Sequence, residues 1–309
     1  MQTAADTAVI LRDPDLPSLF RAADKNSIRA QRVYLRGVRL ELLLLIIGAL
    51  TGVVTIKFGA ADWSSITAAL AFGSALVVRV VRVLNQSDTI WYEGRAVAES
   101  AKSLAWRYAV GGDPFAVQSQ QSGPTEALFS ARLRQTLQDV SGFVVASKES
   151  NGTGIHVTKQ MAEIRAQPLA ARKASYIAGR VQDQIRWYSG RSALNTRRAQ
   201  SWNTLMLLIE LGGLAAAILR AVSVINFDLL GVAATLSAAV MSWLQAKRYS
   251  SLAASYALAE RELRDIETQA QTIAEEQEWA LFVGEAEEAI SREHKLWRAS
   301  RSAEIELLP

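Results

Sequence analysis

Four apolar segments stand out along an otherwise polar chain, at residues 40–56, 63–78, 202–219 and 229–244. Each holds about 16 to 18 residues, and a helix of that length spans roughly 24–27 Å, near the lower limit for crossing a bilayer. Short connections join the first segment to the second and the third to the fourth, so the pattern predicts two helical hairpins. Periodicity alone leaves open the alternative that these are buried helices of a soluble bundle.

Tryptophans at the ends of the segments favour the membrane interpretation. Trp63 and Trp202 open the second and third segments, and Trp243 nearly closes the fourth. Tryptophan is enriched where a bilayer meets water, because its ring is apolar and its N–H group is polar. We therefore expect these three residues to be interface anchors of a membrane protein.

The positions of the basic residues predict the orientation of the hairpins. Basic residues lie before the first and third segments and after the second and fourth: Arg29, Arg32, Arg36, Arg39, Arg79, Arg82, Arg191, Arg197, Arg198, Lys247 and Arg248. The hairpin tips carry only Lys57 with Asp62, and Arg220 with Asp228. By the positive-inside rule, both termini and the middle region are expected in the cytoplasm and both tips outside. The hairpins then run in the same sense, unlike the inverted repeats of many transporters.

Small residues inside the segments predict where helices pack closely. Gly48 and Gly52 form a GxxxG pair in the first segment, and Gly212 and Gly213 lie together in the third. In lipid, where burial of apolar surface does not drive helices together, small residues let two backbones approach. The expected role of these four glycines is helix packing.

Glu210 places a carboxylate inside the third apolar segment. Ionisable groups in a membrane are costly and usually face protein or water. Three interpretations are open: Glu210 lines an aqueous lumen and attracts cations, it pairs with Arg79 or Arg82 at the same membrane level, or it lies at a locally thinned interface. These three residues are the candidate pore or intramembrane polar residues.

The rest of the sequence predicts an all-α protein with long amphipathic cytoplasmic helices. Apolar residues recur at helical spacing after each hairpin, at Ile90, Val97, Ala101, Leu104 and Tyr108, and again at Leu252, Tyr256, Leu263, Ile266 and Ile273. Loops are expected at 111–124 and 148–156, with a break or a kink at Pro168. These helices either couple a signal to the spans or form a bundle that merely supports them, and the sequence leaves both open.

The two halves of the chain resemble each other. KNSIRAQRVYLRGVRLELLLLIIGAL, from Lys25, can be laid on GRSALNTRRAQSWNTLMLLIELGGLA, from Gly190. The expected organisation is an N-terminal segment (1–20), a first two-span repeat (21–112), a cytoplasmic connecting region (113–160) and a second two-span repeat with a C-terminal cytoplasmic helix (161–303).

Composition narrows the possible functions. With 34 basic and 30 acidic residues the formal charge is only +4, which argues against a dedicated nucleic-acid binder. The chain has no cysteine, so disulfides and thiolate metal sites are excluded, and its two histidines are too few for a His-rich metal centre. We find no nucleotide-binding or metalloprotease motif, and GGDPF at Gly111 is at best a weak phosphate-binding loop. We expect no enzymatic activity, no cofactor and no metal.

Several stretches resemble a known family. YIAGRVQDQIRWYSGRSALN, SYALAERELRDI and FVGEAEEAISREHKLWRASR resemble the SLATT family, and WYEGRAVAESAKSLAWRYAVGG resembles another branch of it. The likeness covers roughly residues 15 to 301 and gives two tandem copies, although many relatives are single hairpins. The resemblance implies a two-transmembrane effector associated with SMODS nucleotidyltransferases and SLOG sensors, which perforates the bacterial inner membrane in conflict or antiphage systems. The trigger would be a nucleotide second messenger or a sensor protein on the cytoplasmic side.

The number of spans predicts an assembly. Four short spans cannot enclose a wide pore alone, so a symmetric homo-oligomer in the lipid bilayer is expected. The function expected from these observations is a regulated ion-permeable pore in which Glu210 tunes cation entry. The alternative is a non-conducting membrane scaffold that recruits a cytoplasmic partner through its helical region.

Overall fold

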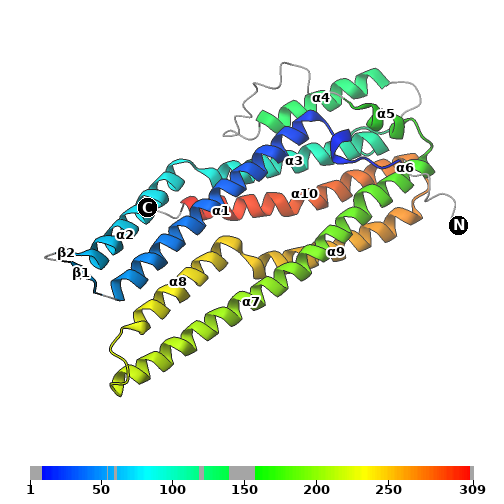
Figure 1. Ribbon diagram of the computed structural model, residues 1–309. Helices are drawn as coiled ribbons and strands as arrows, with labels where there is room; N and C mark the ends of the chain where they lie inside the picture. The colour runs from blue at the N-terminus through cyan, green and yellow to red at the C-terminus, as the bar shows by residue number, and fades with distance from the viewer. Residues whose placement is uncertain (1–8, 54, 59–60, 118–121, 139–156, 307–309) are drawn as a thin grey trace. The chain divides into compact units, whose positions relative to one another are not determined.

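The structure, a computed structural model, describes residues 9–53, 55–58, 61–117, 122–138 and 157–306. These residues form helices almost throughout, so the all-α prediction is confirmed (Figure 1). The chain divides into two units. One contains residues 31–88 and 191–255 and holds both hairpins, and the other contains residues 1–30, 89–190 and 256–309 and holds the helical bundle.

The first hairpin consists of α1 (Ser18–Val53) and α2 (Trp63–Leu84). Two short antiparallel strands, β1 (Lys57–Phe58) and β2 (Ala61–Asp62), form its tip. α2 begins where it does because the Asp62 carboxylate accepts hydrogen bonds from the backbone N–H groups of Ser64 and Ser65, at 3.1 and 3.3 Å. The strands were not predicted from the sequence.

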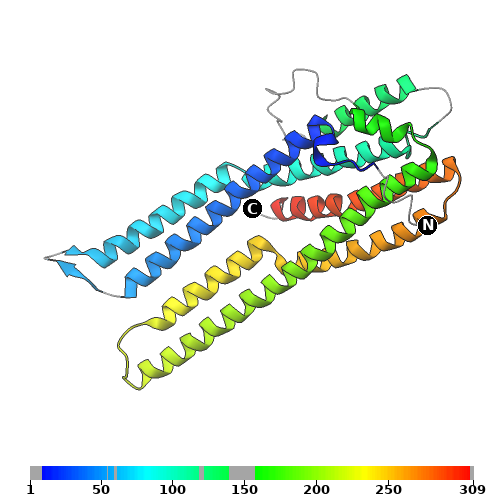
Figure 2. The same cartoon turned by 45° about the vertical axis from the view of Figure 1, so that its right-hand side comes forward.

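The second hairpin consists of α7 (Gln182–Ala221) and α8 (Leu229–Lys247). Its second helix begins in the same way as α2, since the Asp228 carboxylate accepts a hydrogen bond from the backbone N–H of Gly231 at 3.4 Å. In both views the tips of the two hairpins point in the same direction (Figures 1 and 2). An aspartate cap at the same place in each hairpin supports the internal repeat.

Three of the described helical segments are long and apolar enough to cross a membrane, and they contain α2, α7 and α8. The first predicted span, 40–56, is not among them. α1 ends at Val53, so its apolar part is about 14 residues long and reaches roughly 21 Å, well short of the roughly 30 Å hydrocarbon core. The 18 residues that end at Val53 also carry Arg36, Arg39 and Glu41. The helix therefore ends three residues before the predicted end of the span at residue 56.

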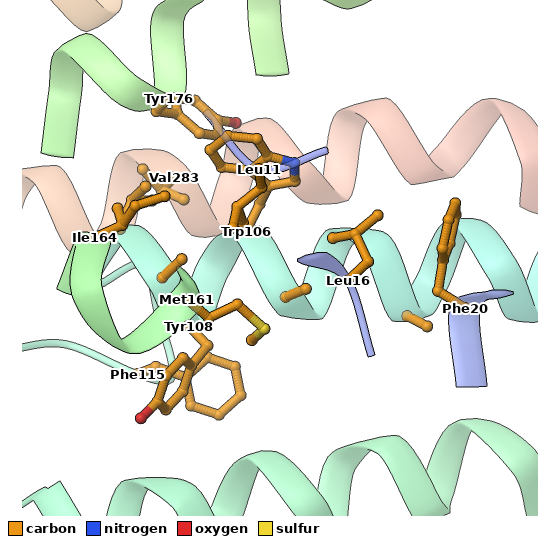
Figure 3. Packing of buried hydrophobic residues seen from close by; sticks show 14 of the residues in the cluster. Leu11, Leu16, Phe20, Trp106, Tyr108, Phe115, Met161, Ile164, Tyr176 and Val283 are labelled. Atoms are coloured by element: carbon orange, nitrogen blue, oxygen red, sulfur yellow. The ribbon is translucent and has the colours of Figure 1, made fainter. Parts of the chain in front are cut away.

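The bundle unit is built around aromatic side chains. It contains most of α3 (Ser87–Val110) and α9 (Tyr249–Thr272), all of α4 (Ser122–Gln138), α5 (Lys159–Arg165), α6 (Leu169–Tyr176) and α10 (Glu276–Glu306), and the N-terminal parts of α1 and α7. Figure 3 shows Trp106 beside Tyr176, and Met161 beside Tyr108 and Phe115. The rings of Trp106 and Tyr176 meet edge to face, with centroids 6.0 Å apart.

The amphipathic faces expected from the sequence supply much of this core. Val97, Ala101 and Tyr108 of α3 are buried, whereas Ile90 is 41% exposed. Leu263 and Ile273 are buried after the second hairpin. Most of each predicted stripe therefore packs inside the bundle, and Ile90 and Leu252 are not part of its core.

One interruption of the helices was predicted from the sequence, and another was not. Pro168 caps the start of α6 and separates it from α5, as expected from its missing N–H group. A π-helical turn, η3 (Ile177–Val181), connects α6 to α7 and was not predicted. α3 ends where the 111–124 loop was expected, although α4 already begins at Ser122. The predicted loop at 148–156 lies outside the described residues.

Candidate functional site

The hairpins expose large apolar side chains. On α7 the side chains of Leu207, Leu208, Leu211 and Leu214 are each more than half exposed. Apolar patches of this kind are rare on soluble monomers and mark contact with lipid or with another protein. Together with the three segments long and apolar enough to cross a bilayer, these side chains indicate a membrane protein whose hairpins face lipid or another protein.

Glu210 lies exposed within this apolar surface. Leu207 and Leu214 share its helix face, at spacings of three and four residues. In the part of the chain that the structure describes, Glu210 forms no ion pair with Arg79 or Arg82. A carboxylate on such a face is unfavourable in hydrocarbon, so water or a second chain is the expected neighbour.

Arg82 is instead paired with Glu41, a residue that the sequence did not single out as a partner. The distance between Arg82 Nη2 and Glu41 Oε2 is 2.7 Å, and the Arg82 guanidinium lies 5.6 Å from the centroid of the Tyr34 ring. A Cβ atom at Gly37 would lie 3.3 Å from Arg82 Cδ, so the glycine leaves room for this side chain. The ion pair holds α1 to α2, and among the described residues Arg82 does not pair with Glu210, which was one of the three interpretations left open.

Two of the four predicted packing glycines touch the partner helix of their hairpin. A Cβ atom at Gly48 would lie 2.9 Å from the Phe72 ring of α2, and one at Gly213 would lie 2.7 Å from Ala233 Cβ of α8. Gly52 and Gly212 have no such neighbour within 4 Å. Within one chain, the close approach therefore depends on Gly48 and Gly213.

The three tryptophans expected at the interface have different environments. Trp63 is 53% exposed, Trp202 is half-buried, and Trp243 is only 8% exposed. The rings of Trp202 and Trp243 lie 6.3 Å apart between centroids, so these two pack between α7 and α8. Within the single chain, the Trp243 side chain is therefore covered mainly by other protein side chains and little of it faces the surroundings.

The bundle unit holds a fully buried ion pair between Arg180 of η3 and Glu287 of α10. Arg180 Nε and Nη2 donate to the two carboxylate oxygens of Glu287 at 2.9 and 2.8 Å, and the Tyr176 hydroxyl donates to Oε1 at 3.1 Å. Burial disfavours the charged guanidinium, but the Glu287 carboxylate outweighs it and raises the pKa of Arg180. Burial and the same carboxylate raise the pKa of Tyr176 well above its usual value. Arg180 therefore stays charged, and Tyr176 neutral, near pH 7.

Other polar side chains fasten the end of α3. Arg172 Nη1 and Trp279 Nε1 both donate to the Val110 carbonyl, at 2.8 and 2.9 Å, and Arg172 also pairs with Glu276. Arg165 Nη1 donates to the carbonyls of Tyr108 and Phe115 at 2.8 and 2.7 Å. The bonds to Tyr108 and Val110 satisfy carbonyls that the end of α3 leaves free, and together these side chains tie α3 and the loop after it to α5, α6 and α10.

The GGDPF loop does not offer the phosphate cradle considered from the sequence. The N–H of Gly112 donates to Arg107 O and that of Asp113 donates to Ala280 O, both at 2.7 Å. The N–H of Phe115 donates to Gly112 O, also at 2.7 Å. Because these backbone donors are already used within the fold, they are not available to a phosphate. Among the described residues no group of three or more histidines and carboxylates could hold a metal.

Sequence reasoning missed the Arg180–Glu287 pair because its partners are 107 positions apart. One signal was present: Glu287 falls on the apolar face of its helix, with Val283 one turn before it and Ile290 after it. An acidic residue on such a face needs a buried partner.

Comparison with known proteins supports the tandem arrangement. Residues 17–173 match the family model described as SMODS and SLOG-associating 2TM effector domain 3, and residues 176–297 match SMODS and SLOG-associating 2TM effector domain 1. Each match contains one hairpin. Neither the curated proteins nor the solved structures contain a match to the chain.

Proposed function

Because the chain belongs to the SLATT family of two-transmembrane effector domains, as two tandem copies, we propose that it assembles into a regulated ion-permeable pore in the bacterial inner membrane. The family consists of membrane effectors associated with SMODS and SLOG conflict systems. Opening such a pore would collapse the membrane potential and stop growth. This function uses no catalytic residue and no cofactor.

The exposed carboxylate of Glu210 is the observation that carries the proposal. Glu210 lies eight residues after Trp202, about 12 Å along α7, and therefore between the interface and the bilayer centre. An ionised carboxylate at that depth costs a few kcal/mol if it faces lipid. A water-filled lumen between subunits removes this cost, because the carboxylate is then hydrated. In such a lumen the negative charge of Glu210 would attract cations.

An assembly supplies the walls of the pore. One chain contributes two hairpins, whose exposed leucines require either lipid or sister subunits. A closed ring of identical chains would place one Glu210 per subunit around a common axis. The first hairpin has leucine near the corresponding position, so the second hairpin lines the lumen.

The bundle unit is the proposed receiver of the signal. The basic residues at the hairpin ends, by the positive-inside rule, support a cytoplasmic location for this unit and for both termini. The helices α1, α7 and α9 each begin in one unit and end in the other, so a change in the bundle reaches the hairpins through continuous helices. The trigger is a nucleotide second messenger or a sensor protein.

Ion flux into liposomes tests the proposal. Purified protein would be reconstituted, candidate cyclic and linear nucleotides added, and K⁺ and Cl⁻ flux recorded for wild type, Glu210→Gln and Glu262→Gln. Glu262 is exposed on α9, outside the hairpins, and serves as the matched control. We expect cation-selective flux that Glu210→Gln weakens and Glu262→Gln leaves unchanged. A folded oligomer that conducts no ions with any trigger would favour a non-conducting scaffold instead.

A further inference from the structure

Five side chains gather at the base of the hairpins, the end opposite the two tips, and we call them the basic–aromatic cluster. They are Arg39, Arg198, Trp243, Lys247 and Tyr249, from α1, α7, α8 and α9, and all belong to the hairpin unit. The Arg39 guanidinium lies 5.0 Å from the centroid of the Trp243 ring, and Lys247 Nζ lies 5.6 Å from the same ring. Two cations from different hairpins therefore share one aromatic ring.

Tyr249 brings the third cation into the cluster. The Arg198 guanidinium lies 6.0 Å and Lys247 Nζ lies 5.9 Å from the centroid of the Tyr249 ring. Arg248 creates this geometry: it ends α8 in the left-handed conformation, with φ of +50°, and its N–H donates to the Leu244 carbonyl at 2.7 Å. Because α9 begins at the next residue, Lys247 and Tyr249 face the cluster from two helices that meet at one turn.

The three cations of the cluster have no acidic partner within the described residues. Arg39 and Arg198 both act on Lys247 as like charges. The hairpin unit has twelve basic and five acidic side chains, a formal charge of +7; the acids are Glu41, Asp62, Asp88, Glu210 and Asp228. Glu41 is held by Arg82 and Asp228 by Arg220, while Asp62 caps α2. No described acid of the unit forms an ion pair with the cluster, and the unit keeps an excess of positive charge.

The cluster lies where the apolar surface of the hairpins gives way to basic residues. Trp243 and Trp202 mark this boundary, and the indole Nε1 of Trp243 is a buried donor without an acceptor. In a bilayer, the boundary between apolar helix and basic end coincides with the lipid phosphates. Arginine and lysine bind phosphate oxygens through charge-assisted hydrogen bonds.

We propose that the basic–aromatic cluster binds the phosphate group of an anionic phospholipid in the leaflet that meets the base of the hairpins. The singly charged lipid phosphate lies among Arg39, Arg198 and Lys247, offsets part of their mutual repulsion and joins the first hairpin to the second. This site is independent of whether the protein conducts ions. A free phosphate ion or a nucleotide carries the same chemical group and is the competing ligand for this site.

Native mass spectrometry of the full chain in detergent tests the site, with phosphatidylglycerol, phosphatidylcholine and inorganic phosphate as separate probes. The test variant is Arg39→Gln/Arg198→Gln/Lys247→Gln. The matched control is Arg32→Gln/Arg36→Gln/Arg197→Gln, which removes the same charge from exposed residues near the same ends of the hairpins. The variant Arg39→Lys/Arg198→Lys keeps the positive charge at both positions. Its binding of phosphatidylglycerol shows whether loss of binding in the test variant reflects the lost charge or misfolding.

We expect wild type, the control and the lysine variant to retain phosphatidylglycerol in preference to phosphatidylcholine. The test variant should bind phosphatidylglycerol on the order of 100-fold more weakly, since each interfacial cation contributes to attraction of anionic lipid. Equal loss in the control would show diffuse charge attraction and overturn the site. No preference for phosphatidylglycerol in wild type, or displacement of it by inorganic phosphate at similar concentration, would overturn the lipid assignment.

Discussion

Arg180 and Glu287 form a two-point ion pair in the interior of the bundle, with side chains that are 1% and 0% exposed. The pair joins the π-helical turn η3 to α10 and receives a third hydrogen bond from Tyr176. One guanidinium nitrogen, Nη1 of Arg180, has no partner among the described residues. A buried network that is not fully satisfied depends strongly on each bond that it does form.

Replacing Glu287 by glutamine should destabilise the bundle by about 3–5 kcal/mol, because Arg180 then keeps a buried charge without a counterion. Thermal unfolding in detergent, followed by circular dichroism, measures this. Glu288→Gln is the matched control, since Glu288 is the exposed neighbour and its loss should change stability by less than about 0.5 kcal/mol. Equal effects of the two substitutions would contradict a stabilising role for the ion pair.

The raised pKa of Tyr176 predicts a loss of stability in alkali. Its pKa in the folded chain lies well above the usual value near 10, so the unfolded chain releases the phenolic proton first as the pH rises. The tyrosine contribution is complete below pH ~10 and is lost as the pH rises through the folded pKa. Tyr176→Phe should lower the free energy of unfolding at pH 7 by about 1–2 kcal/mol. Above pH ~10, the free energy of unfolding of this variant should fall less steeply with pH than that of wild type. An unchanged alkaline decline in the variant would refute this assignment.

The glycines of the hairpins should respond differently to alanine. Gly213→Ala places a methyl group against Ala233 and should cost about 1–3 kcal/mol, and Gly48→Ala should cost less because the Phe72 ring can turn away. Gly52→Ala and Gly212→Ala meet open space and should be neutral or slightly stabilising. Melting temperatures of the four variants in detergent decide this. If Gly52 and Gly212 prove the sensitive pair, they pack against a second chain.

Arg82 and Glu41 should show an energetic coupling. A double-mutant cycle with Glu41→Gln and Arg82→Gln, measured by thermal unfolding, should give about 1–3 kcal/mol for their 2.7 Å ion pair. A second cycle, Glu41→Gln with Arg79→Gln, should give a value near zero, because exposed Arg79 does not pair with Glu41 among the described residues. A larger coupling for Arg79 would mean that Glu41 has a different partner.

The sequence predicts the hairpins and the family well because these depend on local patterns. Apolar runs, flanking arginines and aspartates at the hairpin tips each lie within a few residues of the helix or helix end that they determine. The all-α fold, the tandem SLATT match and the break at Pro168 are confirmed. Helix ends are less well determined, as the early end of α1 at Val53 shows.

The polar contacts were harder to predict because their partners are distant in sequence. Arg82 could pair with Glu210 or Glu41 on charge alone, and only the packing of α1 against α2 selects Glu41. Likewise, Gly48 and Gly52 are equivalent as a motif, and the rotation of α1 decides that Gly48 meets Phe72. The basic–aromatic cluster depends on the turn at Arg248, whose left-handed conformation is unusual for a residue other than glycine.

The most direct test of the account is the accessibility of residue 210 to water in a lipid bilayer. The chain contains no cysteine, so single substitutions Glu210→Cys and Leu208→Cys can be compared without further changes. Leu208 is exposed and lies on the opposite side of α7 from Glu210. In reconstituted oligomers opened by the trigger, a membrane-impermeant thiol reagent should modify Cys at 210 and block ion flux, and leave Cys at 208 unmodified. Modification at 208 but not at 210, or at neither in a conducting oligomer, would contradict a water-filled lumen lined by Glu210.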